Sequence, residues 1–155
     1  MIKPTTIEHK GYTITTDKDL LYPSHVHDWL SNRSYWSKQV PYETVKSAFD
    51  NSYCIGAVKD GRQVGYARLI TDYTTFAYLA DVYVEEEHRG LGLSKKMMEV
   101  IMAQDWVKGL RRIMLATLDA HDLYTQFGFA KPSFPDRLME ITRPGIYDDE
   151  SNPCK

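Results

Sequence analysis

Apolar and polar residues alternate along several short stretches of the chain and follow a helical period in others. Alternation with β-branched residues predicts a strand at 12–17. Two apolar runs flank Asp60-Gly61, and Asp-Gly between such runs is a strong hairpin signal. A further apolar run at 76–84 contains a single carboxylate, Asp81. We therefore expect three consecutive strands between residues 53 and 84.

Helical periodicity combined with capping residues places the helices between these strands. The expected helices are a short one capped by Ser24 and ending near Ser31, one over 41–50 that begins at Pro41, a long one from Gly90–Gly92 to Gly109, and a short one that starts at Ala120 and ends before Gly128. Strands are expected at 111–118 and 136–143. Hairpins together with strand-helix-strand units indicate an α/β protein with a mixed sheet and helices on both faces.

The chain of 155 residues is the size of one domain, and we find no internal repeat or low-complexity linker. We expect a single domain over 1–155, with a core at about 10–143 and a C-terminal tail at 144–155. Hydrophobic residues make up 43% and charged residues 26%, which is a globular composition. A net charge of −2 argues against a nucleic-acid partner, because such proteins usually carry a concentrated basic surface.

Targeting and redox signals are sparse. No apolar run approaches the roughly 20 residues that span a bilayer, and the first residues lack the apolar core of a signal peptide. Cys54 and Cys154 lie far apart and do not form a disulfide framework. We expect a soluble, cytoplasmic protein without a membrane partner.

Two closely spaced glycines, Gly90 and Gly92, stand where the strand at 76–84 gives way to the long helix. A helix N-terminus has unpaired backbone N–H groups and a partial positive charge, and both favour a phosphate. Glycines permit positive φ and a close approach of phosphate oxygens. Arg89 and Ser94 would add a charge-assisted contact and a hydroxyl. The loop therefore predicts an anion site.

Two common nucleotide motifs do not match this loop. A Walker loop requires a second glycine followed by Lys and Ser/Thr, and "GLGLSKK" lacks that ending. A dinucleotide fingerprint requires a third glycine at the position of Lys95. Neither ordinary ATP or GTP hydrolysis nor dinucleotide binding is favoured.

The stretch "DVYVEEEHRGLGLS" (81–94) resembles the acetyl-CoA signature of the GNAT superfamily of N-acetyltransferases. In that family a Gln/Arg-x-x-Gly-x-Gly/Ala segment wraps the CoA pyrophosphate, and Arg89, Gly90 and Gly92 are in register with it. Glu87 departs from the pattern, and we expect it to point outward. A second stretch, "ATLDAHDLYTQFGFAK" (116–131), resembles the family's last conserved helix, with Ala120, Leu123, Tyr124, Gly128 and Phe129 in order. Thr117 replaces the usual asparagine, which puts one pantetheine contact in doubt.

The resemblance covers about residues 10 to 143 and implies a GNAT-like fold in which the strands at 76–84 and 111–118 splay apart. It implies acetyl-CoA as co-substrate and no metal. In agreement, His25 and His27 have no further ligands at metal-site spacing. The residues that it places at the cofactor are Val82, Tyr83, Val84, Arg89, Gly90, Leu91, Gly92, Leu93, Ser94, Thr117 and Asp119. A bulge in the strand at 76–84 would free a backbone N–H near Val82 or Tyr83 to polarise the thioester carbonyl.

Acetyl transfer to an amine also requires a base and a proton donor, because alkylamines keep their proton until pH ~10.4. Asp81 is the candidate base, directly or through water. The alternative is that Asp81 faces solvent or pairs with Arg68. The resemblance gives Tyr124 the role of general acid toward the CoA thiolate, and the alternative is a core tyrosine. Cys54, within a strand, is a poor nucleophile candidate.

Aromatic residues gather in the region that caps the acceptor site in the resembled family, and Trp29, Tyr35 and Trp36 are the candidate pocket residues. Trp29 has the alternative role of anchoring the first helix to the core. The sequence favours an acetyl-CoA-dependent N-acetyltransferase that acts directly on a primary amine of a small molecule. A non-catalytic acyl-CoA sensor and a protein lysine or N-terminal acetyltransferase stay open as alternatives, and so does a homodimer.

Overall fold

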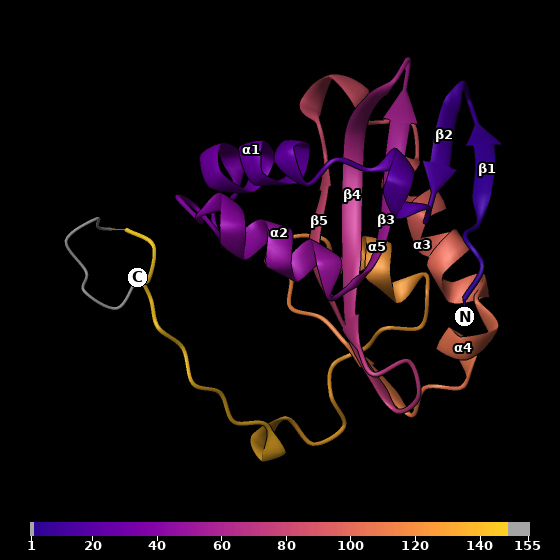
Figure 1. Cartoon of the computed structure of the whole chain (residues 1–155). Helices are drawn as coiled ribbons and strands as arrows, with labels where there is room; N and C mark the ends of the chain where they lie inside the picture. Colours follow the sequence, from indigo (N-terminus) through magenta and orange to yellow (C-terminus); the bar gives the residue numbers. More distant parts are fainter. Residues whose placement is uncertain (1, 149–155) are drawn as a thin grey trace.

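The computed structural model describes residues 2–148, which are built around one six-stranded sheet with the order β1-β2-β3-β4-β5-β6 (Figure 1). The strands are β1 (Thr6–His9), β2 (Tyr12–Thr15), β3 (Tyr53–Lys59), β4 (Arg62–Thr71), β5 (Phe76–Val84) and β6 (Arg112–Met114). Neighbouring strands are antiparallel except β5 and β6, which are parallel. The predicted mixed sheet and its central hairpin around Asp60-Gly61 are confirmed.

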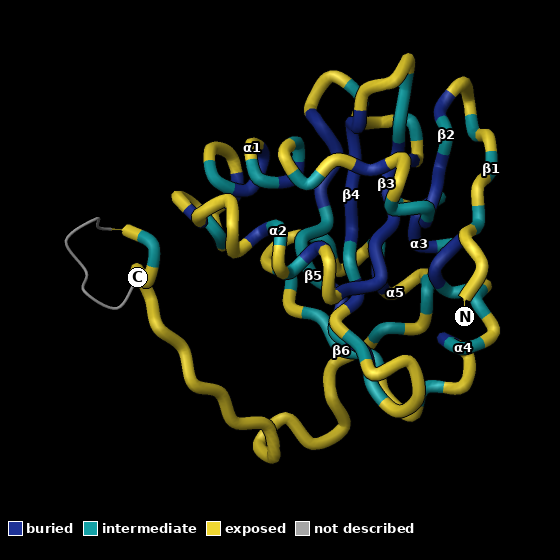
Figure 2. Tube along the Cα trace, in the orientation of Figure 1, coloured by how far each residue is buried: buried dark blue, intermediate teal, exposed yellow. Residues whose placement is uncertain are grey.

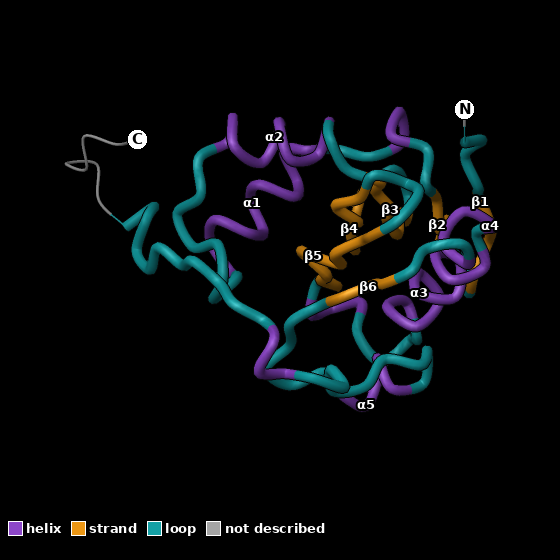
Figure 3. The backbone as a smooth tube through the Cα atoms, turned by 90° about the horizontal axis from the view of Figure 1, so that it is seen from below, coloured by secondary structure: helices purple, strands orange, loops and turns teal. Residues whose placement is uncertain are grey.

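Helices cover both faces of this sheet, as Figure 3 shows when the sheet is seen from below. The helices are α1 (Pro23–Arg33), α2 (Tyr42–Asp50), α3 (Leu93–Ala103), α4 (Asp105–Lys108) and α5 (His121–Thr125), with short 3-10 turns η1 (Lys18–Leu20), η2 (Glu86–His88) and η3 (Pro135–Arg137). The pair α1 and α2 lies on one face, and α3 and α5 lie on the other. Within residues 2–148 no helix has both the length and the apolar character that crossing a bilayer would require.

Each face of the sheet has its own apolar core. On the α3 face, Met97, Met98 and Ile101 are buried against Ile55 and Leu69 of the central strands. The residues buried on the α1–α2 face are Leu21, Val26, Trp29, Leu30, Val40, Val45, Phe49, Cys54, Tyr66 and Tyr83. Because β3 and β4 are apolar on both faces, they are buried along most of their length (Figure 2).

An N-terminal hairpin extends the sheet beyond the predicted strand at 12–17. Thr6–His9 pairs with Tyr12–Thr15, and the turn between them has Lys10 at φ 49° and Gly11 at φ 81°. Glycine at such a turn adopts positive φ without a Cβ penalty. The Lys-Gly turn between two alternating segments was the sequence signal for this hairpin.

Two predicted boundaries are corrected by the structure. The long helix ends at Ala103 and not near Gly109, because Gln104 is extended at φ −65°, ψ 132° and a separate short helix, α4, follows. The strand predicted at 111–118 is shorter, since only Arg112–Met114 pairs with β5.

The strand predicted at 136–143 is wrong for the single chain. Residues 130–148, here called the C-terminal arm, contain only the turn η3 and run away from the body (Figures 1 and 2) before Tyr147 packs against the α1–α2 core. Alternation alone does not make a strand, because a strand requires a neighbour to pair its backbone N–H and C=O groups. Among residues 2–148 no strand pairs with this segment. Cys154 and the rest of 149–155 lie outside the described residues.

Candidate active site

A β-bulge interrupts the pairing of the two strands at the centre of the sheet. Tyr66 pairs with Tyr83 and Arg68 pairs with Ala80, so Ala67 alone faces the two residues Asp81 and Val82. Asp81 has φ 55°, in the left-handed region that residues other than glycine rarely adopt. Strain of this kind persists where the surroundings hold it in place and is common at functional sites. The bulge predicted near Val82 and Tyr83 is confirmed.

The same strand loses its other neighbour just before the bulge. Pairing between β5 and β6 runs from Phe76 with Arg112 to Tyr78 with Met114 and stops there. From Leu79 onward, no described strand pairs with β5 on its β6 side. The predicted splay is therefore present, and Val82, Tyr83 and Val84 lie on the stretch of β5 that borders it.

The glycine loop leads from this end of β5 to α3. Gly90 has φ 78° and Gly92 has φ 74°, so both use the conformational freedom that the sequence predicted. Gly92 is the N-cap of α3, and no side chain caps the first turn of the helix. The N–H groups of that turn and the positive end of an 11-residue helix are thus available to an anion.

Some of the remaining residues of the glycine loop stabilise its backbone or are buried, and others are exposed to solvent. Arg89 is exposed, and its Nε donates to the Val84 carbonyl over 3.0 Å. Leu93 is buried in the core, so it can offer a ligand only its backbone. Leu91 and Ser94 are half-buried, and Glu87 is exposed, in agreement with the outward orientation expected for it.

The N-terminal hairpin contacts the glycine loop through His9 and Tyr12. The sequence analysis did not predict this contact. His9 Nε2 lies 3.2 Å from the Leu91 carbonyl oxygen. The hydroxyl of Tyr12 and Nδ1 of His88 are 2.8 Å apart, and the two rings meet edge to face. The hairpin therefore fixes both the turn before the glycines and the backbone between them.

Tyr124, the candidate proton donor, lies on α5 and is buried with 7% of its surface exposed. Burial, with smaller contributions from the nearby groups Asp119 and Tyr35, raises the pKa of its phenol to about 12. Tyr35 comes from the loop between α1 and α2. The structure thus brings candidate residues from both faces of the sheet close together.

The two residues predicted near the pantetheine arm, Thr117 and Asp119, lie in the loop between β6 and α5. Thr117 Oγ1 accepts a hydrogen bond from the Ala120 N–H over 3.0 Å and so orders the start of α5. The side chain of Asp119 is exposed. Thr117 therefore stabilises the start of the helix that carries Tyr124.

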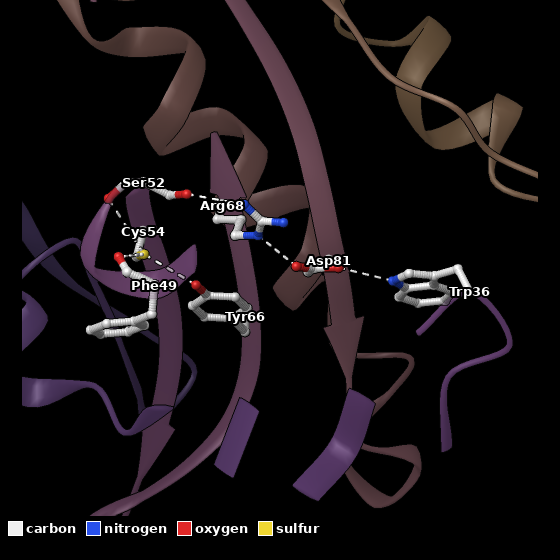
Figure 4. Close-up of polar contacts among 7 residues, drawn as sticks. All are labelled: Trp36, Phe49, Ser52, Cys54, Tyr66, Arg68 and Asp81. Atoms are coloured by element: carbon white, nitrogen blue, oxygen red, sulfur yellow. Dashed lines mark hydrogen bonds and ion pairs between the residues drawn. The ribbon is translucent and has the colours of Figure 1, made fainter. Parts of the chain in front are cut away.

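Asp81, the candidate base, is held by two donors (Figure 4). Arg68 Nε donates to Oδ2 over 2.5 Å, and Trp36 Nε1 donates to Oδ1 over 2.9 Å. Side-chain exposure is 10% for Asp81 and 16% for Arg68, so the ion pair is largely buried. Arg68 also donates to Ser52 Oγ over 3.1 Å. The structure thus confirms the alternative considered for Asp81, an ion pair with Arg68.

The aromatic candidates form a wall beside this ion pair. Trp29 is buried and stacks on Tyr83 with ring centroids 4.4 Å apart, which is the anchoring role considered for it. Trp36 contacts both Trp29 and Tyr35, and Tyr35 is 66% exposed. Tyr35 and Trp36 are therefore the accessible members of the wall.

A cavity of about 60 Å³ lies between α1, α2, β4 and β5, on the same side as Asp81. Its lining combines aliphatic side chains with polar residues, which include Arg68, Asp81 and Tyr66. Tyr147 of the C-terminal arm also lines it.

Cys54 lies on β3, the strand that pairs with β4 on the side away from β5. Its side chain is buried, with Sγ 3.1 Å from the Tyr66 hydroxyl and 3.4 Å from the Phe49 carbonyl oxygen (Figure 4). Burial raises the pKa of the thiol. A buried thiol that keeps its proton is a poor nucleophile, which confirms the expectation for Cys54.

In this structure a mixed sheet bulges and loses strand pairing beside a glycine loop at a helix N-terminus. The model of the Acetyltransferase (GNAT) family matches residues 24–129. The chain belongs to this family of acetyltransferases, as the sequence analysis expected.

Relatives of known sequence or structure support the assignment. A Gibberella zeae protein named as an acetyltransferase is 31% identical to this chain over 143 residues. The match covers 79% of this chain and 80% of the Gibberella zeae protein. The thialysine N-epsilon-acetyltransferase of Bos taurus is 36% identical over 73 residues, 42% of this chain and 43% of its own. A Xanthomonas campestris crystal structure assigned to the GNAT family is 47% identical with a TM-score of 0.87, covering 92% of this chain and all of that chain. A Clostridium acetobutylicum structure with acetyl-CoA has a TM-score of 0.62 at 14% identity, covering 92% and 96%, and shares the fold.

Changing Gly90 to alanine tests the glycine loop. Gly90 and Gly61 have nearly the same φ, 78° and 77°, and a Cβ at either position meets no atom within 4 Å. Gly90→Ala and Gly61→Ala should therefore cost similar stability, about 1 kcal/mol each. Only Gly90→Ala should weaken acetyl-CoA binding, by about tenfold, because its Cβ stands where phosphate would approach. Calorimetric titration with acetyl-CoA measures this difference, and equal affinities in the two variants would remove Gly90 from the site.

Proposed function

We propose that this acetyltransferase transfers the acetyl group of acetyl-CoA directly to a primary amine of a small molecule. The observation that carries the proposal is that β5 loses its pairing with β6 after Tyr78, bulges at Asp81 and Val82, and then leads through the glycine loop to the N-terminus of α3. Pyrophosphate would bind at the glycine loop, and the pantetheine arm would lie along the open edge of β5 as an added strand would.

In the proposed reaction the amine nitrogen attacks the thioester carbonyl carbon. A C–N bond forms, the C–S bond breaks, the amine loses one proton and the CoA thiolate gains one. A backbone N–H at Val82 or Tyr83 would stabilise the negative charge that develops on the carbonyl oxygen. No acetyl-enzyme is required, and Cys54 is too buried to form one.

Tyr124 is proposed to donate a hydrogen bond to the departing sulfur. A phenol whose pKa is raised to about 12 is a weaker acid than a CoA thiol, for which a pKa near ~8.5 is typical. Stabilisation of the thiolate by a hydrogen bond is therefore favoured over complete proton transfer before the C–S bond breaks.

The raised pKa of Tyr124 has a consequence for pH dependence. A phenol that ionises at about 12 keeps its proton throughout the range in which the amine becomes deprotonated. The ratio kcat/KM should rise with pH and show no descending limb up to about pH 10. Because the folded pKa is above the unfolded value near 10, the contribution of Tyr124 to stability is complete below that pH and is lost above it. A descending limb near pH 9 that disappears in Tyr124→Phe would contradict this assignment.

Asp81 is proposed to position the site, with water accepting the proton from the amine. Both of its carboxylate oxygens already accept a hydrogen bond, from Arg68 and from Trp36. A carboxylate held by these two donors keeps the bulge and the aromatic wall in place, and the proposal therefore leaves the proton of the amine to water.

A small-molecule acceptor is favoured by the aromatic surroundings of the bulge. The cavity next to Asp81 holds only about 60 Å³, and the accessible rings of Tyr35 and Trp36 suit an apolar body or a cation over a ring face. The bovine relative's name gives it a thialysine acceptor, which is a small amine-bearing amino acid. A protein lysine would instead require an open groove beside these rings.

The test is the release of CoA thiol from acetyl-CoA with a panel of arylalkylamines, polyamines, amino acids, aminosugars and lysine peptides. Small amines should accelerate release at least tenfold over buffer, and lysine peptides should not. Preference for the peptides would replace the small-molecule acceptor by a protein one. Tight acetyl-CoA binding without amine-dependent release would favour the sensor module.

A further inference from the structure

The last described residues of the C-terminal arm return to the α1–α2 face of the sheet. Every residue of the arm is exposed except Tyr147, which is half-buried and packs against the apolar core under α1 and α2. Figures 1 and 3 show the arm running away from the sheet and ending beside the loop that joins these two helices. Tyr147 is therefore the residue through which the arm contacts this face.

A turn and a glutamine hold the end of the arm at this place. The chain turns at Gly145, which has φ 73°, and the Asp148 N–H donates to the Gly145 carbonyl over 3.0 Å. Gln39 lies in the loop between α1 and α2. With its amide nitrogen facing the turn, Gln39 donates to the carbonyl oxygens of Tyr147 and Asp148 over 3.1 and 3.2 Å. The end of the arm is thus tied to the loop that carries the accessible rings of the aromatic wall.

Tyr147 borders the cavity of about 60 Å³ that adjoins the bulge. The rest of the lining comes from α1, α2, the loop between them, β4 and β5. Asp81 belongs both to this lining and to the bulge, and Figure 4 shows its carboxylate between Arg68 and Trp36. Carbon atoms attached to an amine at the bulge can therefore extend into the cavity. A space of this size holds a few water molecules or one small group of a ligand.

We propose that Tyr147 is a wall of the acceptor site and limits the acceptor to primary amines with a short aliphatic body. The inference rests on the proposed function, since it takes the bulge as the place of acetyl transfer. Val26, Leu30 and Val45 contribute to the lining and favour an apolar group over a charged one. A longer amine would have to push the ring of Tyr147 off the apolar core. One methylene group too many in an apolar pocket is worth about tenfold to two-hundredfold in kcat/KM.

Acetylation of a series of straight-chain primary amines, from ethylamine to octylamine, measures this limit. In the wild type, kcat/KM should fall by about tenfold or more once the chain exceeds a short length. Tyr147→Ala should raise kcat/KM about tenfold or more for the first amine that the wild type rejects, and Tyr147→Phe should keep the wild-type limit because the ring remains. The matched control is Ile146→Ala, since Ile146 is adjacent, 40% exposed and outside the lining. It should keep the wild-type limit, and acetyl-CoA affinity should be equal in all these proteins.

A second variant, Gln39→Glu, tests the same limit without changing Tyr147. A carboxylate beside two carbonyl oxygens loses both hydrogen bonds and repels the turn, so the limit should move toward longer amines as in Tyr147→Ala. An unchanged limit in Tyr147→Ala, or an equal fall in kcat/KM for every amine, overturns the inference and leaves the proposed function standing. A wild type that acetylates other amines but none of this series overturns the short aliphatic acceptor alone. A wild type that acetylates no amine overturns the proposed function as well.

Discussion

Tyr124→Phe is expected to lower kcat for amine acetylation by about tenfold to a hundredfold, with little change in acetyl-CoA affinity. The hydroxyl would act on sulfur only as the C–S bond breaks, so its loss removes stabilisation of the transition state and leaves ground-state binding intact. The aromatic ring, which packs edge to face on Phe129 at a centroid distance of 5.9 Å, remains in the variant. Steady-state kinetics at saturating amine measure the effect.

Tyr53→Phe is the matched control for this experiment. Tyr53 has the same exposure as Tyr124, 7%, but lies on β3 against Trp106, away from the bulge. Removing either hydroxyl should change the free energy of unfolding by about 1 kcal/mol or less. A kcat in Tyr124→Phe equal to that of Tyr53→Phe would assign Tyr124 to the core, the alternative raised by its sequence position.

Asp81→Asn is expected to reduce the free energy of unfolding by about 3 kcal/mol. The substitution leaves the Arg68 guanidinium 16% exposed and without its carboxylate, and an uncompensated buried charge is costly. It also removes the charge that accepts from Trp36 Nε1, which stands at the accessible end of the aromatic wall. Urea unfolding followed by tryptophan fluorescence measures the loss.

Asp50→Asn provides the comparison for an exposed ion pair. The Lys46–Asp50 pair has the same N–O distance as the Arg68–Asp81 pair, 2.5 Å, but its side chains are 41% and 50% exposed. Its loss should cost about 0.5 kcal/mol or less. Equal losses in the two variants would contradict a buried structural role for Asp81. A pH–rate profile of Asp81→Asn that loses its ascending limb would instead make Asp81 the base.

The turns and the helix start at the site could be predicted because each has a signal in a few neighbouring residues. Gly90 and Gly92 indicated positive φ and a helix start, and the hairpin at Asp60-Gly61 was marked by its turn. The bulge at Asp81 was expected only from the family resemblance, since pairing register depends on the neighbouring strand and has no local pattern. Arg68 was considered as a partner for Asp81 for chemical reasons, and only the fold shows that the two meet.

The features of the site that could not be predicted from the sequence depend on contacts between distant segments of the chain. The contact of His9 with Leu91 joins residues 82 positions apart, and the electrostatic effect of Tyr35 on Tyr124 joins the loop after α1 to α5. The C-terminal arm shows the converse case. Its alternation predicted a strand at 136–143, and that prediction was wrong, because no described strand pairs with this segment.

The most direct test of the proposed function is simultaneous measurement of thiol release and amide formation by the wild type with acetyl-CoA and a small primary amine. The account predicts that both products form at equal rates, that both depend on the amine, and that acetyl-CoA alone leaves no acetyl group on the protein. Thiol release that is independent of the amine, or an acetylated protein that precedes the amide, would contradict direct transfer at the β5 bulge.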